Sequence, residues 1–291
     1  MPSKVIGPVG LVAHAGKPKA AELVRTLASD FRGCGAEVLL ETETATLAGE
    51  SDGLSTAILG ERCSVLVVLG GDGTILKVVH EFDQHLCPIF GINLGSLGFL
   101  TCVSSADHGA AVEAICFGRF VLSMRALLAV SVEREGEVVA KRTALNDAVI
   151  SRGELSQLIK LDTTIDNAAL TEYNADGLII ATPTGSTAYS LSAGGPVLMP
   201  ESGVFVVTPI CPHVLTNRSV IVSDQSEITV RPAPGQCDVV LMVDGQQPVR
   251  LCEGDIIRIR KRRLQLPLAM LPDLSFCQVL RQKLKWSGTA V

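Results

Sequence analysis

The fold is most clearly indicated by the stretch Val65-Leu66-Val67-Val68-Leu69-Gly70-Gly71-Asp72-Gly73-Thr74. Five apolar residues of buried-strand type lead into a loop in which three glycines surround one carboxylate, and the helix-compatible segment 75–79 follows. A strand that enters a glycine-rich loop before a helix gathers backbone N–H groups around one point, where they can bind anionic oxygen. This stretch therefore predicts a phosphate-binding loop.

A second stretch of the same kind is Asp176-Gly177-Leu178-Ile179-Ile180-Ala181-Thr182-Pro183-Thr184-Gly185-Ser186-Thr187-Ala188-Tyr189-Ser190. It again begins with an apolar strand and continues into glycine and hydroxyl residues. Ser186 and Thr187 are residue types that cap exposed N–H groups at the start of a helix. We therefore expect a second polar loop and a helix here.

The amino-terminal part of the chain alternates short apolar runs with amphipathic segments. Val9–Ala13 is the first run, and Leu23, Leu27 and Phe31 follow at helical spacing, closed by Gly33. Repeated strand–helix–strand order predicts a Rossmann-like parallel sheet with helices on both faces. Ligands of such sheets bind at the carboxyl ends of the strands.

Beyond Phe120 the pattern becomes mainly that of β-structure. Glu135-Gly136 and Asp244-Gly245 each follow an apolar strand and predict hairpin turns, which is a sufficient explanation for Asp244 on sequence grounds. Alternation of Arg258 and Arg260 with isoleucines predicts a strand with one solvated face. The tail from Ser275 to Trp286 is expected to be helical. We expect an α/β domain followed by a β-rich, β-sandwich-like domain, with the ligand between them.

Composition limits the class of protein. A length of 291 residues with 47% hydrophobic content allows about two domains, each with a core. The net charge of −5 argues against nonspecific binding to nucleic acid or to an anionic membrane. No apolar run reaches the ~20 residues of a membrane span, and the start has no signal-peptide core. Nine scattered cysteines without a C-x-x-C pair indicate neither a disulfide framework nor a zinc site, so a cytoplasmic protein is expected.

Asp72 is the residue with the clearest chemical potential. Amid phosphate-binding amides, its carboxylate could hold Mg²⁺ against phosphates or accept the proton of an attacking hydroxyl; alternatively, it could satisfy only local N–H groups in a turn. Neither G-x-x-x-x-G-K-[ST] nor a helix-opening G-x-G-x-x-G is present, so ordinary P-loop or Rossmann cofactor chemistry is not indicated. Asn146-Asp147 places two polar side chains in an apolar strand, where they need hydrogen-bond partners, or marks a strand end.

Four segments together resemble the NAD kinase family over most of the chain. They are Gly70–Thr74, Asn93-Leu94-Gly95-Ser96-Leu97-Gly98-Phe99-Leu100, Asn146-Asp147 and Asp176–Pro196. The glycine loop alone also resembles loops of diacylglycerol kinases, sphingosine kinases and 6-phosphofructokinase, whereas the long 176–196 block is specific. The resemblance implies transfer of the γ-phosphoryl group of ATP to the 2′-hydroxyl of the adenosine ribose of NAD⁺, with Mg²⁺ bound through the ATP phosphates and, in one arrangement, by Asp72.

The same resemblance implies roles for individual residues. Asp72 is the catalytic base or metal-organising carboxylate, and Asn146 with Asp147 contacts the dinucleotide, the acid on ribose hydroxyls. In the family, the aspartate that corresponds to Asp176 comes from a neighbouring subunit and contacts the nicotinamide end of the dinucleotide. The remaining nucleotide- and NAD-binding positions implied by the family are Gly70, Gly71, Gly73, Thr74, Phe99, Thr187, Ala188, Tyr189, Ser192 and His213.

Residue chemistry alone leaves simpler explanations open at some of these positions. Phe99 is also an ordinary core residue, Asp176 a solvated strand-entry residue and His213 a loop histidine. Asn146 is followed by Asp rather than the commoner Glu. Segment 171–175 has no Arg or Lys, so a preference for oxidised dinucleotide that depends on a basic residue there does not carry over.

The expected organisation is an α/β nucleotide-binding domain over residues 1–122, joined by the carboxyl-terminal helix 264–291, and a β-rich dinucleotide-binding and oligomerisation domain over 123–263. The expected partners are NAD⁺ and ATP, with polyphosphate as an alternative donor, in a homodimer or homotetramer. Two other functions stay open: a lipid or sugar kinase that shares the glycine loop, and a non-catalytic NAD(P)-binding sensor. The second would be expected to lack Asp72.

Overall fold

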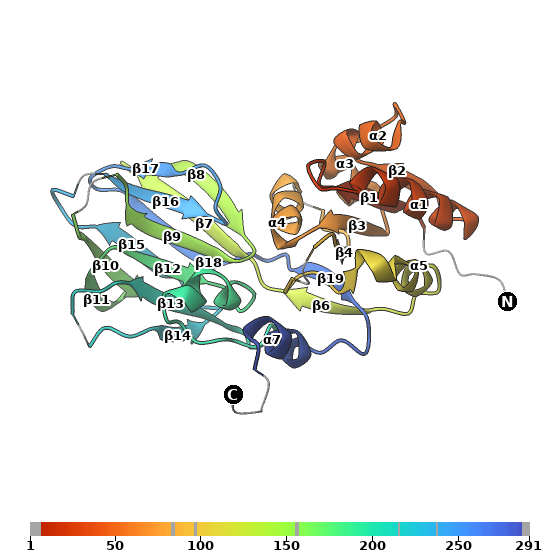
Figure 1. Ribbon diagram of the computed structural model, residues 1–291. Coiled ribbons are helices and arrows are strands. Elements are labelled where there is room, and N and C mark those ends of the chain that lie inside the picture. The colour runs from red at the N-terminus through yellow and green to blue at the C-terminus, as the bar shows by residue number, and fades with distance from the viewer. Residues whose placement is uncertain are drawn as a thin grey trace. The chain divides into compact units, whose positions relative to one another are not determined.

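The computed structural model describes residues 7–82, 85–95, 98–154, 157–214, 216–236 and 238–286, which form two compact units (Figure 1). Unit 1 comprises Met1–Met124 and Leu266–Val291, and unit 2 comprises Arg125–Gln265. The chain therefore leaves unit 1, builds unit 2 and returns.

Unit 1 contains a seven-stranded sheet in the order β2-β1-β3-β4-β19-β6, with β5 paired to β4. Its strands are β1 (Val9–Ala13), β2 (Val38–Leu40), β3 (Val65–Gly70), β4 (Ile89–Asn93), β5 (Val103–Ser104), β6 (Val121–Arg125) and β19 (Leu266–Met270). The pairs β1–β2, β1–β3, β3–β4, β4–β5 and β4–β19 are all parallel. The predicted Rossmann-like sheet is confirmed.

Helices occupy segments between the strands of unit 1 and the segment after β19. They are α1 (Ala20–Gly33), α2 (Thr42–Ala48), α3 (Thr56–Arg62), α4 (Asp72–Glu81), the 3₁₀ turn η1 (Ser105–Asp107), α5 (His108–Cys116) and α7 (Phe276–Leu284). In α1 the predicted positions Leu23, Leu27 and Phe31 are buried. The crossover from β1 to β2 and that from β3 to β4 run in opposite directions, so right-handed connections place α1 and α4 on opposite faces.

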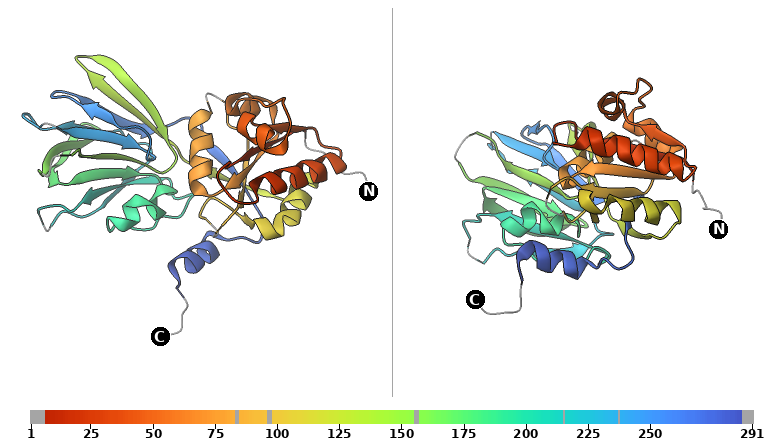
Figure 2. Two further views of the ribbon diagram at one scale, coloured as in Figure 1. Left: turned by 45° about the horizontal axis from the view of Figure 1, so that its top comes forward. Right: turned by 45° about the vertical axis from the view of Figure 1, so that its right-hand side comes forward.

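Unit 2 is a sandwich of two six-stranded antiparallel sheets, ordered β11-β10-β15-β18-β7-β8 and β14-β13-β12-β9-β16-β17 (Figure 2). The first sheet contains β7 (Leu128–Arg134), β8 (Glu137–Ala144), β10 (Ile159–Ile165), β11 (Ala168–Ala175), β15 (Ile228–Pro232) and β18 (Ile256–Lys261). The second contains β9 (Asp147–Arg152), β12 (Gly177–Ala181), β13 (Val204–Ile210), β14 (Val220–Ser223), β16 (Val239–Val243) and β17 (Val249–Leu251). The β-sandwich-like expectation is confirmed.

One apolar core fills the space between these sheets. Val130 and Tyr173 reach it from the first sheet, and Ile150, Ile180 and Phe205 from the second. Alternate residues of β7 are buried, as expected for a strand with one face in the core. Full burial of each large side chain contributes about 1.5–3 kcal/mol. The core thus fixes the strand register from which the polar loops extend.

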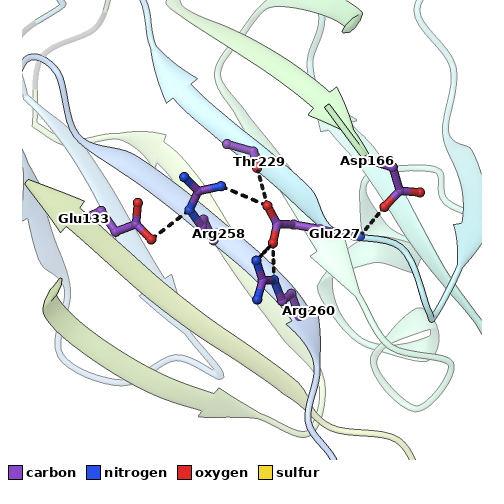
Figure 3. Close-up of polar contacts among 6 residues, drawn as sticks. All are labelled: Glu133, Asp166, Glu227, Thr229, Arg258 and Arg260. Carbon is purple, nitrogen blue, oxygen red and sulfur yellow. Dashed lines mark hydrogen bonds and ion pairs between the residues drawn. The ribbon is translucent and has the colours of Figure 1, made fainter. Parts of the chain in front are cut away.

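The outer face of the first sheet carries an ion-pair network (Figure 3). Arg258 donates to Glu133 at 2.7 Å and to Glu227 at 2.9 Å, and Arg260 also pairs with Glu227. The intervening Ile257 and Ile259 are completely buried. The predicted one-sided strand is confirmed, and these two basic residues face carboxylates of the same chain.

The second polar stretch also folds largely as expected. After β12 come a 3₁₀ turn, η2 (Gly185–Thr187), and a single helical turn, α6 (Tyr189–Ser192), so the predicted helix is short. Leu198, further along, packs on the outer face of the second sheet against Val149 and Val206. Within the described residues, none of the helices combines the length and apolar character needed to cross a membrane.

Candidate functional site

A cavity of about 440 Å³ lies at the carboxyl ends of β1 and β3 in unit 1. Residues 14–17 line it from the loop after β1, and Gly71, Gly73 and Thr74 line it from the loop after β3. These adjacent strands continue to neighbours on opposite sides, so the cavity marks the point where the strand order reverses. Open α/β sheets bind ligands at this place.

The glycine loop joins β3 to α4 without a spacer. Gly71 is the N-cap of α4, and its N–H donates to the Thr74 hydroxyl at 3.4 Å. A Cβ atom on Gly70 would lie 2.1 Å from Thr74 Oγ1, so this position must be glycine for the turn to close. The first turn of α4 is left with N–H groups that have no helical partner, and the helix dipole adds partial positive charge. The loop can therefore bind phosphate oxygen.

The carboxylate of Asp72, the first residue of α4, is held by a distant loop. Its Oδ2 accepts the N–H of Phe99 at 2.9 Å, and its Oδ1 accepts the N–H of Leu100 at 3.0 Å. A Cβ on Gly98 would lie 1.9 Å from Asp72 Oδ1, so glycine at 98 permits this approach. The two motifs singled out in the sequence thus form one structure.

The loop that holds Asp72 is itself fixed by polar contacts. Thr101 Oγ1 accepts the N–H of Gly98 at 2.8 Å and the side-chain amide of Asn93 at 3.3 Å. The side-chain oxygen of Asn93, Oδ1, accepts a hydrogen bond from the N–H of Gly95. Ser96 and Leu97, which belong to the same motif, lie outside the described residues.

Phe99 is half-buried and packs within unit 1. Its ring centroid lies 6.3 Å from that of Phe276 at the start of α7, and Lys283 Nζ lies 6.0 Å from the Phe99 ring. The expected contact with adenine stays a prediction.

Unit 2 presents Asn146 and Asp147 where the chain enters β9. Asp147 is buried, and burial together with the charge of Asp244 raises the pKa of its carboxyl to about 7. Neither the Asn146 nor the Asp147 side chain hydrogen-bonds to another described residue. A polar pair in this state can accept or donate hydrogen bonds to a ligand.

The loop after β12 lies beside this pair. Ala181, the last residue of β12, is directly opposite Asp147, and Gly185 packs so closely on Asn146 that a Cβ would be 2.1 Å from the Asn146 carbonyl oxygen. The predicted positions Thr187, Ala188, Tyr189 and Ser192 follow in η2 and α6. Tyr189 is 47% exposed and can stack on a planar group.

Asp176 and His213 lie at the other end of the same sheet. Asp176 precedes β12 and accepts the Arg152 guanidinium at 2.8 Å, while the exposed His213 donates its backbone N–H to Asn174. Because β12 separates Asp176 from Ala181, Asp176 is roughly 17 Å along the strand from the Asp147 end. The predicted site residues of unit 2 therefore form two groups: Asn146, Asp147 and the loop after β12 at one end of the sheet, and Asp176 and His213 at the other.

Sequence interpretation missed Asp244 by assigning it only to a turn. It does adopt a left-handed conformation, φ 45°, next to Gly245 at φ 71° in the hairpin between β16 and β17. Its carboxylate also accepts the N–H groups of residues 145–147. The available signal was the sequence Asp244-Gly245-Gln246, which resembles a short motif of the NAD kinase family.

The described part of the chain has no cluster of three or more His, Cys, Asp or Glu residues that could hold a metal ion. Each oxygen of the Asp72 carboxylate already accepts one N–H and retains a further lone pair. Asp72 therefore suits a metal that brings most of its own ligands, as Mg²⁺ does when bound to nucleotide phosphates.

Comparison with known proteins agrees with this geometry. Residues 9–120 match the family "ATP-NAD kinase N-terminal domain", and residues 145–270 match "ATP-NAD kinase C-terminal domain". The NAD kinase of Syntrophotalea carbinolica is 40% identical over 96% of this chain and 98% of its own length. That of Solibacter usitatus is 39% identical over 97% of this chain and 98% of its own length.

Solved structures give the same result. Yeast NADH kinase complexed with NADH superposes with a TM-score of 0.88 at 27% identity, covering 98% of this chain and 89% of the yeast chain. An NAD kinase from Archaeoglobus fulgidus in complex with ATP has the same fold, with a TM-score of 0.74 at 24% identity, covering 96% of this chain and 98% of that chain. The protein described here belongs to the NAD kinase family.

Proposed function

We propose that this protein phosphorylates NAD⁺ at the 2′-hydroxyl of its adenosine ribose, with ATP as donor, and releases NADP⁺. The main support for this proposal is the position of Asp72. Two backbone N–H groups fix its carboxylate. Its neighbours in sequence, Gly71 and Gly73, both line the cavity. Membership of the NAD kinase family indicates that NAD⁺ is the acceptor of the phosphoryl group. The loop and its carboxylate supply the parts that phosphoryl transfer to a hydroxyl needs.

Asp72 acts as the general base. A ribose hydroxyl ionises far above neutral pH, so its oxygen attacks phosphorus effectively only if the proton leaves as the new bond forms. Phe99 and Leu100 each occupy one acceptor site on the carboxylate and leave a lone pair for that proton. Asp72 takes the proton while the oxygen–phosphorus bond forms and the bond to the ADP leaving group breaks.

The start of α4 binds phosphate oxygens next to the cavity, where Gly71, Gly73 and Thr74 are lining residues and the N–H of Gly73 has no hydrogen-bond partner among the described residues. Mg²⁺ arrives with ATP and neutralises phosphate charge. The protein's contribution is to position the reacting groups: the glycine loop holds the phosphates, and the N–H groups of Phe99 and Leu100 hold Asp72, the proton acceptor.

Asn146 and Asp147 bind the dinucleotide through ribose hydroxyls. Their side chains have no hydrogen-bond partner among the described residues, so a ligand hydroxyl can satisfy them. Thr187, Ala188, Tyr189 and Ser192 surround the adenine, where the exposed Tyr189 ring stacks. Phe99 contributes to the same contact.

Asp176 serves the site of another copy, and His213, whose family counterpart lies near the reacting ribose and phosphate, is at the same end of the sheet. They lie at the opposite end of the second sheet from Asp147, which supports a homodimer or homotetramer in which Asp176 of one subunit meets the nicotinamide end of a ligand held by the next. The eight described cysteines form no disulfide bonds with one another, which fits a reducing, cytoplasmic location.

The test is direct. Purified protein is incubated with Mg-ATP and NAD⁺, and product is measured with a dehydrogenase that requires NADP⁺. Parallel reactions replace NAD⁺ with NADH, with diacylglycerol or with fructose 6-phosphate, and replace ATP with polyphosphate. We expect NADP⁺ from ATP and NAD⁺. Turnover of the lipid or sugar alone, or dinucleotide binding without any phosphorylated product, would contradict the proposed function.

A further inference from the structure

Two described residues, Asp244 and Thr182, hold the main chain of segment 145–147, which presents Asn146 and Asp147. Asp244 Oδ2 accepts the N–H of Leu145 at 2.7 Å, and Asp244 Oδ1 accepts those of Asn146 at 2.9 Å and Asp147 at 2.8 Å. Three successive amides thus converge on one carboxylate, where the charge makes each hydrogen bond stronger than a neutral one.

The carbonyl groups of the same segment are also satisfied. Thr182 donates its hydroxyl to the Leu145 carbonyl and its N–H to the Asn146 carbonyl, and Asp244 donates its own N–H to the Asp147 carbonyl at 3.0 Å. All six main-chain polar groups of residues 145–147 are therefore bonded to Asp244 or Thr182. These bonds restrain the backbone of the segment and so fix the directions in which its Cα–Cβ bonds point.

A turn does not require this aspartate. At φ 45° and φ 71°, Asp244 and Gly245 both occupy the left-handed region, where glycine or asparagine serves equally well or better. What only a carboxylate provides is two acceptor oxygens that together accept three N–H groups. The side chain therefore has a purpose beyond the hairpin.

We propose that Asp244 is a positioning residue for dinucleotide binding, which fixes the directions of the Asn146 and Asp147 side chains through the backbone of segment 145–147. The proposal rests on the proposed function, because it assigns the dinucleotide to that pair. Asp244 itself touches the backbone and not the ligand.

The charge of Asp244 gives the proposal a second readout. Burial and this charge raise the pKa of Asp147 to about 7. The strand on the other side of Asp147, β12, presents the uncharged Ala181, and the loop beyond it presents Thr182 and Gly185. Removing the charge at 244 should thus move the Asp147 titration to lower pH.

Two substitutions separate positioning from turn formation. Asp244→Gly keeps the turn and removes the carboxylate, whereas Asp244→Asn keeps the size and one acceptor oxygen and removes the charge. The matched control is Asp166→Asn. Asp166 has φ 50° in the hairpin between β10 and β11 and accepts one backbone N–H, that of Glu227, at 2.8 Å (Figure 3).

We expect both Asp244 variants to raise the KM for NAD⁺ about 10- to 100-fold, with little change in the KM for ATP, because misplacing a binding group by about 1 Å has effects of this size. Calorimetric NAD⁺ binding should weaken in parallel. In Asp244→Asn the inflection of kcat/KM near pH 7 should move to lower pH. Asp166→Asn should match the wild type in all three measurements.

The outcomes are distinguishable. A folded Asp244→Gly protein with wild-type NAD⁺ affinity would show that the turn is sufficient and would overturn the proposal. If that variant does not fold, Asp244→Asn with an unchanged KM and an unchanged inflection overturns it instead. Failure of the wild type to form NADP⁺ would count against the proposed function, and calorimetry of NAD⁺ binding would still test the role of Asp244.

Discussion

Gly98 and Asp72, 26 positions apart in sequence, are in contact: a Cβ atom on Gly98 would lie 1.9 Å from Asp72 Oδ1. The same loop donates the N–H groups of Phe99 and Leu100 to this carboxylate. A methyl group at position 98 must therefore displace the side chain, the loop or both.

Gly98→Ala should lower kcat about 100-fold, because the proton acceptor is moved from its position. The matched control is Gly109→Ala in α5, where a Cβ meets nothing within 4 Å and alanine favours the helix. Steady-state kinetics and thermal unfolding of both variants check this. Full activity in a folded Gly98→Ala protein would show that the contact has no catalytic consequence.

Asp72→Asn should reduce kcat about 10²- to 10⁴-fold while NAD⁺ affinity changes little, since a general base acts mainly in the transition state. The asparagine also lacks one of the two acceptor oxygens, so one amide of the 99–100 loop loses its partner. Single-turnover rates and calorimetric NAD⁺ binding separate the two effects. Undiminished turnover would remove Asp72 from the role of base.

Asp147 should make stability depend on pH. Its pKa is about 7 in the folded protein against 3.8 for the ordinary side chain, so folding favours the protonated form. Below about pH 4 the Asp147 carboxyl is protonated in both the folded and the unfolded state, so it does not affect stability. As pH rises from about 4 to about 7, the unfolded state loses this proton more readily, and the folded protein becomes less stable. The Asp147→Asn variant does not carry this cost. Its free energy of unfolding, compared with that of the wild type, should therefore be more favourable at pH 8 than at pH 4 by roughly 2–4 kcal/mol.

Urea unfolding at both pH values measures this difference. Asp162→Asn, which changes an exposed carboxylate of β10, provides the control and should show no such pH-dependent gain. An Asp147→Asn curve parallel to that of the wild type at both pH values would contradict the buried, protonated state.

The cysteines should separate by reactivity. Burial raises the pKa of Cys63, Cys87 and Cys102 to about 12, so these thiols are protonated at neutral pH and shielded from reagents. Cys211 and Cys277 are exposed. Titration with a chromogenic disulfide reagent should label the exposed thiols rapidly and the buried three only after urea is added, with peptide mapping as the check. Cys237 lies outside the described residues.

Asp176 should act in a second subunit. Asp72→Asn and Asp176→Asn proteins, each nearly inactive alone, should regain activity when refolded together. A mixed dimer has one site with both aspartates intact, so an equal mixture should recover about one quarter of wild-type activity. No recovery despite mixed oligomers, shown by differently tagged chains, would place Asp72 and Asp176 in the same subunit's site.

Sequence patterns predicted the elements that depend on local periodicity. The buried strand β3, the apolar face of α1 and the Glu135-Gly136 hairpin all follow from neighbouring residues. The strand β19 was not predicted, because it contains Pro267 and its partner β4 lies far away in sequence. Strand pairing over such a separation leaves no local signal.

The candidate site shows the same division. Glycine loops are visible in the sequence, but the contact of Gly98 with Asp72 and the three amides on Asp244 exist only after folding. Asp244 satisfies the requirements of a hairpin turn, so nothing local revealed its second set of partners. The domain roles and the individual ligand contacts implied by resemblance stay predictions.

The position of β19 has a consequence for synthesis on the ribosome. This strand lies between β4 and β6 in the sheet of unit 1, yet it is made only after all of unit 2. A nascent chain that has emerged as far as Gln265 can complete its sandwich while its first sheet still has a gap. Emergence of residues 266–270 from the exit tunnel is then the event that closes the sheet of unit 1.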